Sequence, residues 1–95
     1  MNNLITTSKF SKLLRKKEES FQDYVITKIS EAIELLRNSE NPESLGEKKK
    51  GKLKGLYAYE LTKSSRLLYK VERREGKIYV VLLRVCNHKQ VYDIN

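Results

Sequence analysis

The sequence predicts an α+β fold in which two N-terminal helices pack on one face of a small antiparallel sheet of three to five strands. Two observations predict it: apolar residues recur at helical spacing up to Asn38, and the periodicity changes to strand-like alternation after Gly55. Because the connections after Gly55 are short, consecutive strands should be neighbours in the sheet. A chain of 95 residues is long enough for one core, so we expect a single domain over residues 1–95.

A short strand is expected at Leu4–Thr6, followed by a first helix over residues 8–17. Ser8 is the expected N-cap, because a serine hydroxyl accepts a hydrogen bond from a free N–H group of the first turn. Lysines and an arginine occupy the other faces of this helix, and its apolar residues recur at helical spacing: Phe10, Leu13 and Leu14.

A second helix is expected over residues 20–38. Ser20 caps it, and Asp23 in its first turn interacts favourably with the positive end of the helix. The helix ends before Pro42, because the residue that precedes a proline disfavours the helical conformation. One stripe of side chains is apolar, which suits a helix lying on a sheet: Phe21, Val25, Ile29, Ala32, Ile33 and Leu36.

Three main strands are expected over residues 56–61, 66–73 and 77–86, with a hairpin turn at Glu75-Gly76. The first two strands alternate, and the third is the most apolar run of the chain, so we expect the third to be a central strand buried on both faces. Residues 89–94 are expected to add a short last strand. The tyrosines of the main strands are expected to pack in the core or on a sheet face: Tyr57, Tyr59, Tyr69 and Tyr79.

The net charge of +8 belongs to the second half of the chain, where residues 48–95 carry 13 Lys/Arg against 4 Asp/Glu. Such a one-sided field attracts polyanions, of which nucleic acid is the commonest, and the alternative is a generic solubilising surface. The densest part is KKKGKLK, residues 48–54, in which five of seven residues are lysine. This segment is either a solvated loop or a clamp for phosphate.

Several function classes are excluded by what the chain lacks. No stretch approaches the roughly 20 apolar residues that cross a bilayer, and the N-terminus has no signal-peptide core, so we expect no membrane association and a cytoplasmic location. Cys86 is the only cysteine and is expected to be a small buried hydrophobe. The carboxylates of the second half are scattered, so we expect no metal site and no cofactor.

Cations, one imidazole and several phenols remain for chemistry, and together they suit RNA cleavage without metal. Histidine suits proton transfer because its pKa lies near 7, so His88 is the candidate acid or base. Arginine binds two phosphate oxygens with its planar fork, which makes Arg66 the candidate phosphate ligand. Tyr92 is the candidate for orienting a nucleotide. Each has a structural alternative: His88 as a strand end, Tyr92 as a C-terminal anchor, and Arg66 as a cross-strand partner of Glu60 or Glu72.

Residues 53–92 resemble the C-terminal half of RelE/ParE-superfamily toxins, the toxin halves of toxin–antitoxin pairs. Three features carry the resemblance: a glycine-containing entry into a strand at Leu53–Leu61, the strand RLLY at 66–69, and the ending NHKQVY at 87–92. The two expected helices also lie where the family places its helical pair. The resemblance therefore covers nearly the whole chain.

The resemblance implies a metal-independent endoribonuclease that cleaves mRNA in the ribosomal A site and is neutralised by a cognate antitoxin in a heteromeric complex. Arg66 matches the arginine on the scissile phosphate in RelE- and YoeB-like members, His88 matches the C-terminal histidine of YafQ-like members, and Tyr92 matches the terminal aromatic residue. The first strand of many RelE members bears an extra arginine, where this chain reads YAYEL, and Glu60 in that strand is either a base or a partner of Arg66. Three lysines match those that face the phosphate backbone: Lys50, Lys52 and Lys54.

Two other functions stay open at this point. ParE-like members of the superfamily inhibit DNA gyrase and typically lack the catalytic set, so the presence of Arg66, His88 and Tyr92 favours the ribonuclease. The remaining alternative is a basic domain that binds nucleic acid without cleaving it.

Overall fold

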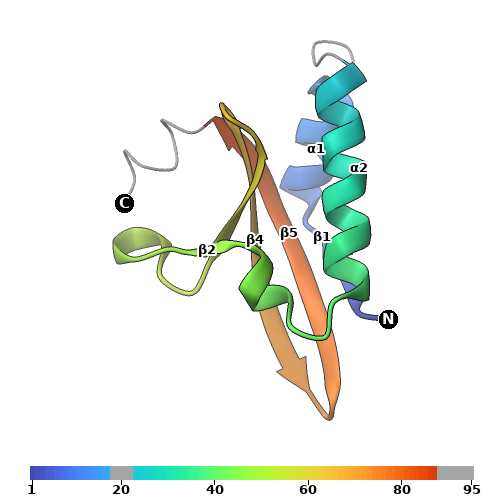
Figure 1. Ribbon diagram of the computed structural model, residues 1–95, viewed down its shortest axis with the longest axis vertical. Helices are drawn as coiled ribbons and strands as arrows, with labels where there is room; N and C mark the ends of the chain where they lie inside the picture. The colour runs from blue at the N-terminus through green and yellow to red at the C-terminus, as the bar shows by residue number, and fades with distance from the viewer. Residues whose placement is uncertain (18–22, 88–95) are drawn as a thin grey trace.

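A computed structural model describes residues 1–17 and 23–87 of the chain. Within these residues, five strands form one sheet in the order β1-β5-β4-β3-β2. Both helices lie on the same side of the sheet (Figure 1), where α1 packs beside β5 and α2 beside β3. In chain order the elements, with two short 3-10 turns, are β1 (Asn3–Thr6), α1 (Ser8–Lys17), α2 (Asp23–Asn38), η1 (Pro42–Leu45), β2 (Glu47–Lys48), η2 (Gly51–Leu53), β3 (Tyr57–Thr62), β4 (Ser65–Arg74) and β5 (Lys77–Asn87).

The predicted α+β class and the two helices on one face are confirmed, but the sheet is mixed and not antiparallel throughout. β1 runs parallel to β5, with Leu4 opposite Val80. No turn links these two strands, so no hairpin forces them to run in opposite directions. β2 was predicted as part of a loop, and with two residues it is too short for an alternating pattern. The predicted last strand over residues 89–94 lies outside the described residues.

The first helix spans the predicted residues, but its N-cap is Thr7 and not Ser8. The Thr7 hydroxyl accepts a hydrogen bond from the Phe10 N–H at 3.1 Å, and the Thr7 carbonyl accepts one from the Ser11 N–H at 3.0 Å. These two bonds satisfy N–H groups of the first turn, which is the function of a cap. The second helix ends at Asn38 as predicted, while the proposed cap Ser20 and Phe21 of its stripe lie outside the described residues.

The main core lies between the helices and the covered face of the sheet. Of the predicted apolar stripe of α2, Ile29, Ala32 and Leu36 are buried there, and Val25 and Ile33 are partly buried. The Tyr69 ring is fully buried and stacks on the Tyr57 ring with 5.5 Å between centroids, as the predicted packing of the strand tyrosines requires. The buried members of this cluster are Phe10, Ile29, Ala32, Leu36, Leu61, Leu67, Tyr69, Val80, Leu82 and Val85.

The β4–β5 hairpin has the predicted turn and one irregularity further along. Glu75 and Gly76 both have positive φ, at 50° and 76°, as the tight two-residue hairpin turn requires. The register between β4 and β5 then shifts by one residue, because Tyr69 lies opposite Leu82 whereas Leu68 lies opposite Arg84. Leu83 is the extra residue of a β-bulge. Beyond the bulge, every side chain of β5 points to the face opposite to the one that strict alternation assigns.

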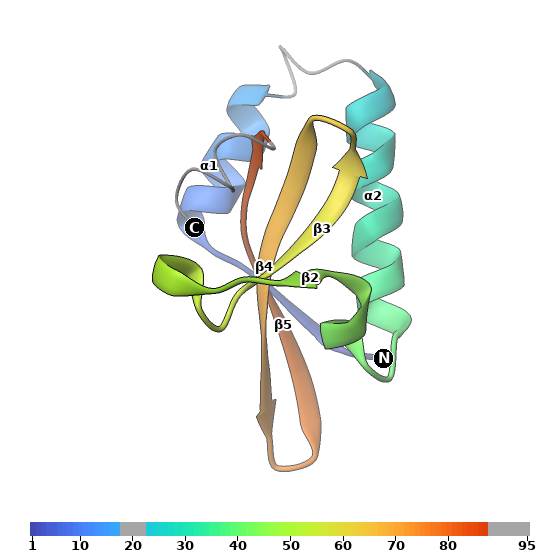
Figure 2. The same cartoon turned by 60° about the vertical axis from the view of Figure 1, so that its left-hand side comes forward.

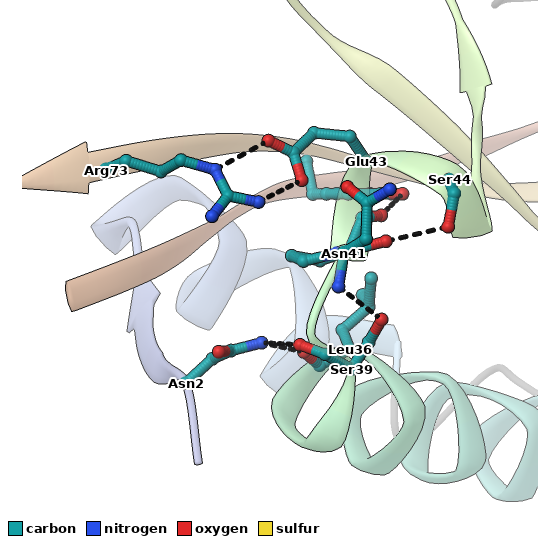
Figure 3. A network of polar contacts seen from close by, with 9 residues as sticks. Asn2, Leu36, Ser39, Asn41, Glu43, Ser44 and Arg73 are labelled. Atoms are coloured by element: carbon teal, nitrogen blue, oxygen red, sulfur yellow. Dashed lines mark hydrogen bonds and ion pairs between the residues drawn. The ribbon is translucent and has the colours of Figure 1, made fainter. Parts of the chain in front are cut away.

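Polar contacts hold the connection between α2 and β2 to the N-terminal residue Asn2 and to Arg73 of β4 (Figure 3). The Asn2 amide donates hydrogen bonds to the carbonyls of Leu36 and Ser39, at 2.8 and 2.7 Å, and so satisfies free acceptors at the end of α2. Arg73 of β4 binds the Glu43 carboxylate with two parallel hydrogen bonds of 3.1 and 2.9 Å. This bond lowers the pKa of Glu43 below its ordinary value.

Gly46 is required where this connection crosses Tyr69. The Tyr69 hydroxyl donates a hydrogen bond of 2.7 Å to the Pro42 carbonyl, and burial raises the pKa of Tyr69, so the hydroxyl keeps the proton that it donates. A Cβ atom at position 46 would lie 2.6 Å from the Tyr69 hydroxyl oxygen. Only glycine lets the backbone pass this close to the ring.

No helix among the described residues is long and apolar enough to span a membrane.

Candidate functional site

The face of the sheet that the helices leave uncovered, called the open face below, carries the candidate site. Figure 2 views the molecule with the segment from β2 to η2 in front of the sheet and the helices behind it. The open face has a small apolar cluster of its own, built on Ala58, Leu68 and Cys86. Cys86 is buried there, as its predicted role as a small hydrophobe requires.

Strand register places charged residues beside this cluster. Glu60, Arg66 and Cys86 lie opposite one another on β3, β4 and β5, and the neighbouring open-face row is Ala58, Leu68 and Arg84. Arg66 and Arg84 are thus diagonal neighbours on adjacent strands, a spacing of about 7–8 Å that long side chains can bridge. The open face therefore carries two arginines on adjacent strands.

Arg66 is held in one orientation by the turn between β3 and β4. Its side chain is buried, and Nη1 donates hydrogen bonds to the carbonyls of Thr62, Ser65 and Lys63 at 2.6, 3.1 and 3.4 Å. These bonds tie the guanidinium to the backbone of the turn between β3 and β4. Arg66 consequently has a structural function in addition to any chemistry, because the turn depends on its guanidinium.

Glu60 completes the surroundings of Arg66. Its Oε1 lies 3.2 Å from Nη2 of Arg66, while two thirds of the Glu60 side chain remain exposed, at 67%. Glu72, the other partner that the sequence suggested, instead pairs with Lys70 and Arg74 at the far end of β4. The hydrogen bond from Lys70 lowers the pKa of Glu72.

His88 and Tyr92 lie outside the described residues. The described chain ends at Asn87, which lies opposite Ser65, the residue before Arg66. His88 follows Asn87 directly in the sequence.

The lysine-rich segment is folded, and its lysines differ in exposure. The backbone of β2 and η2 is held by hydrogen bonds from the N–H groups of Lys49, Lys54 and Leu56 to the carbonyls of Leu56, Gly51 and Leu53. The three predicted RNA-binding side chains are exposed: Lys50, Lys52 and Lys54.

Lys49 differs from its neighbours, because its side chain is only 1% exposed and its Nζ lies 3.8 Å from Oε1 of Glu47. Within a run of five lysines, the sequence contains no signal that separates this buried residue from the others.

Arg84 is the residue of the open face that sequence reasoning missed. Strict alternation from the hairpin turn places Arg84 on the same face as Leu82, toward the helices. The bulge at Leu83 turns it to the open face, opposite Leu68. No group of three or more His, Cys, Asp or Glu residues that could hold a metal ion occurs in the described ranges 1–17 and 23–87.

Among the solved structures that are similar to this chain are toxins named YoeB and YafQ. A YoeB/ParE toxin from Agrobacterium tumefaciens matches with a TM-score of 0.74 and 19% identity over 90% of this chain and 98% of the other. YafQ from Escherichia coli strain BL21(DE3) matches with a TM-score of 0.73 and 15% identity over 97% and 99%. A YoeB–YefM complex from Staphylococcus aureus matches with a TM-score of 0.66 and 20% identity over 93% and 98%. At these identities the likeness shows a shared fold.

The family is shown by a match of residues 4–94 to the model of the ParE-like toxin of type II bacterial toxin–antitoxin systems. No curated protein sequence matches the chain significantly. The match spans nearly all of the chain, and the structural likeness to YoeB and YafQ agrees with it. The resemblance inferred from RLLY and NHKQVY is therefore confirmed, and the chain belongs to the ParE-like toxins of type II toxin–antitoxin systems, within the RelE/ParE superfamily.

Proposed function

We propose that this toxin is a ribosome-dependent mRNA endoribonuclease, in which the ribose 2′-OH attacks the adjacent phosphate without a metal or other cofactor. The arrangement around Arg66 carries the proposal. A guanidinium whose Nη1 is already fixed by three carbonyls loses little conformational freedom on meeting a phosphate, which would displace the Glu60 carboxylate from Nη2. The net charge of +8 favours encounter with RNA.

Each of the other residues has a proposed role in the same reaction. His88 transfers a proton, either from the attacking 2′-OH or to the leaving 5′-oxygen. Tyr92 orients the nucleotide by stacking. The exposed lysines of the 48–54 segment contact the RNA backbone: Lys50, Lys52 and Lys54. Glu60 either acts as a base or competes with phosphate for Arg66, since it lies 3.2 Å from the guanidinium.

The proposed partners are mRNA in the ribosomal A site, in the cytoplasm, and a cognate antitoxin in a heteromeric complex. Membership of a type II toxin–antitoxin family supports the antitoxin. Two structures similar to this chain are complexes of YoeB with YefM from Staphylococcus aureus, which supports the same kind of assembly here.

The test is induction of the toxin without antitoxin, followed by mapping of mRNA 5′ ends in ribosome fractions. We expect codon-periodic cuts from the wild-type chain and a loss of about 100-fold or more for Arg66→Ala and for His88→Ala. Arg74→Ala is the matched control, since it removes one exposed arginine at the other end of β4 and should leave cleavage unchanged. Full toxicity of both the Arg66 and His88 variants would contradict the mechanism.

A structural failure of Arg66→Ala has to be separated from a chemical one, because Arg66 also holds the β3–β4 turn. Arg66→Lys keeps the charge and one donor group but loses the fork. We expect this variant to bind antitoxin like the wild type and to cleave at least tenfold more slowly. Melting temperatures of the toxin–antitoxin complex report folding independently of cleavage.

DNA gyrase inhibition is the second candidate function, and the observation that favours it is the match to a ParE-like family model. It predicts that the purified toxin blocks DNA supercoiling by gyrase in vitro. Induction would then activate the DNA-damage response while translation continues. Codon-periodic mRNA cuts with undisturbed supercoiling would exclude this alternative.

A further inference from the structure

A pocket of about 360 Å³ opens on the same face of the sheet as Arg66. It lies where α1 begins, where η2 passes and where β5 continues past the end of β1. Pockets that hold small ligands have volumes of about 300–1,000 Å³, so this one accommodates a single ring-sized group. Its apolar lining consists of Leu53, Leu56, Leu68 and Leu83.

The edge of the pocket is cationic. Lys9 and Arg84 line the pocket together with the polar residue Thr7, and the exposed lysines Lys52 and Lys54 flank Leu53 in the chain. An apolar lining with cations at its edge suits a ligand that combines a flat apolar group with an anion. A nucleotide has this combination in its base and its phosphate.

The pocket lies on the same face as Arg66 and shares its strand. Leu68 follows Arg66 by two residues on β4, about 7 Å further along the strand, and Arg84 lies opposite Leu68. The Arg66 guanidinium contacts carbonyls of the β3–β4 turn, at the end of β4 away from Leu68. An RNA strand with a phosphate at Arg66 that runs along β4 therefore leads toward the pocket.

We propose that this pocket holds the nucleobase adjacent to the cleaved phosphate and thereby contributes to the choice of cleavage position, an inference that rests on the proposed ribonuclease function. A leucine lining favours any base by burying its face and offers few hydrogen-bond partners. The pocket therefore increases the affinity for RNA and fixes the position of the strand, but it discriminates little between the four bases.

The experiment measures binding of the full-length toxin to ribosomes that hold, in the A site, an mRNA with a 2′-deoxy substitution at the cut site, which removes the attacking hydroxyl. Abasic sites are introduced one position at a time on each side of the cut, and the affinity of the toxin for these ribosomes is measured by fluorescence anisotropy. We expect a single abasic position to weaken binding by about tenfold.

Two pocket-filling variants, Leu83→Trp and Leu53→Trp, reach the pocket from different elements, β5 and η2. Each should weaken binding of the intact RNA by about tenfold. In each variant, the abasic position that weakens binding to the wild type should cause no further loss, and this further loss is called the abasic effect below. Leu35→Trp is the matched control, since Leu35 is 50% exposed on α2, on the other side of the sheet. It should keep both the affinity and the abasic effect.

Each remaining outcome decides the inference. If the abasic effect persists in both filled variants while they cleave mRNA at wild-type positions, the pocket assignment is wrong and the ribonuclease function stands. If the wild type neither binds the RNA nor cleaves mRNA, both are wrong. If the filled variants lose affinity for the antitoxin but not for RNA, the pocket belongs to the protein partner and the inference is overturned.

Discussion

The two faces of the sheet are built on different principles. The covered face is closed by apolar side chains from both helices, and its buried hydroxyl at Tyr69 is paired with Pro42. The open face has a smaller apolar cluster, two buried cations at Lys49 and Arg66, and a pocket. The covered face stabilises the fold by excluding water from apolar side chains. The open face buries cationic side chains, which costs desolvation free energy. The larger apolar core therefore lies on the covered face, and the charged candidate site lies on the open face.

The comparison is tested most strongly by truncating adjacent leucines of β4 that point to opposite faces. Leu67 and Leu68 are 0% and 2% exposed, but Leu67 lies in the main core and Leu68 beside the pocket. We expect Leu67→Ala to lower the free energy of unfolding by about 3–5 kcal/mol and Leu68→Ala by about 2 kcal/mol, because the cavity at Leu68 can relax toward solvent. Urea titrations with matched m-values measure both, and equal losses would contradict the distinction between the faces.

Gly46 tests how tightly the covered face is closed. Gly46→Ala should lower the free energy of unfolding by about 1–3 kcal/mol, because its Cβ would lie 2.6 Å from the Tyr69 hydroxyl oxygen. Tyr69→Phe removes that oxygen and costs about 1 kcal/mol by leaving the Pro42 carbonyl without its donor.

The double variant sharpens this prediction. Since the closest atom is absent in Tyr69→Phe, the cost of Gly46→Ala should be smaller in that background than in the wild type. Strictly additive costs would show that the contact with the hydroxyl is not the cause.

Glu60 separates two roles on the open face. If the carboxylate competes with phosphate for Arg66, Glu60→Gln should tighten RNA binding by about threefold at low salt, with a smaller gain at high salt. If Glu60 is a base, the same variant should bind at least as tightly but cleave more slowly. Anisotropy titrations and single-turnover cleavage with the same ribosome-bound mRNA distinguish these outcomes. Unchanged binding and cleavage would show that Glu60 has neither role.

The Glu43–Arg73 pair should contribute a small, pH-dependent stabilisation. The pKa of Glu43 is lowered in the folded protein by the hydrogen bond from Arg73, from an ordinary value of 4.5. The stabilisation is therefore fully present above pH 4.5 and is lost as the pH falls through the lower folded-state pKa. Glu43→Gln should melt at a slightly lower temperature than the wild type near neutral pH and at the same temperature in strong acid. A difference that grows toward acid pH would contradict this assignment.

Much of the fold follows from periodicity in the sequence. The helix over residues 8–17, the stripe of α2 and the three long strands were all visible as spacing of apolar side chains. Helix caps are harder to predict from the sequence, since Thr7 and Ser8 are equally suited to capping. The hydrogen bond from the Phe10 N–H to the Thr7 hydroxyl identifies Thr7 as the cap. The candidate site was predicted in part, because RLLY identified Arg66 but nothing in the sequence reported its contacts with the turn.

The sequence by itself determined the layers, the strong positive charge of the second half and membership of the toxin family, because these depend on composition and on the order of residues. Tertiary structure decided which charged residues share a face. The bulge at Leu83 shifts the register by one residue and so turns Arg84 to the side of Arg66. Burial separates Lys49 from the other lysines of its run, and pairing with a distant strand makes β1 parallel to β5. Such outcomes depend on contacts between residues far apart in the chain, which local spacing does not encode.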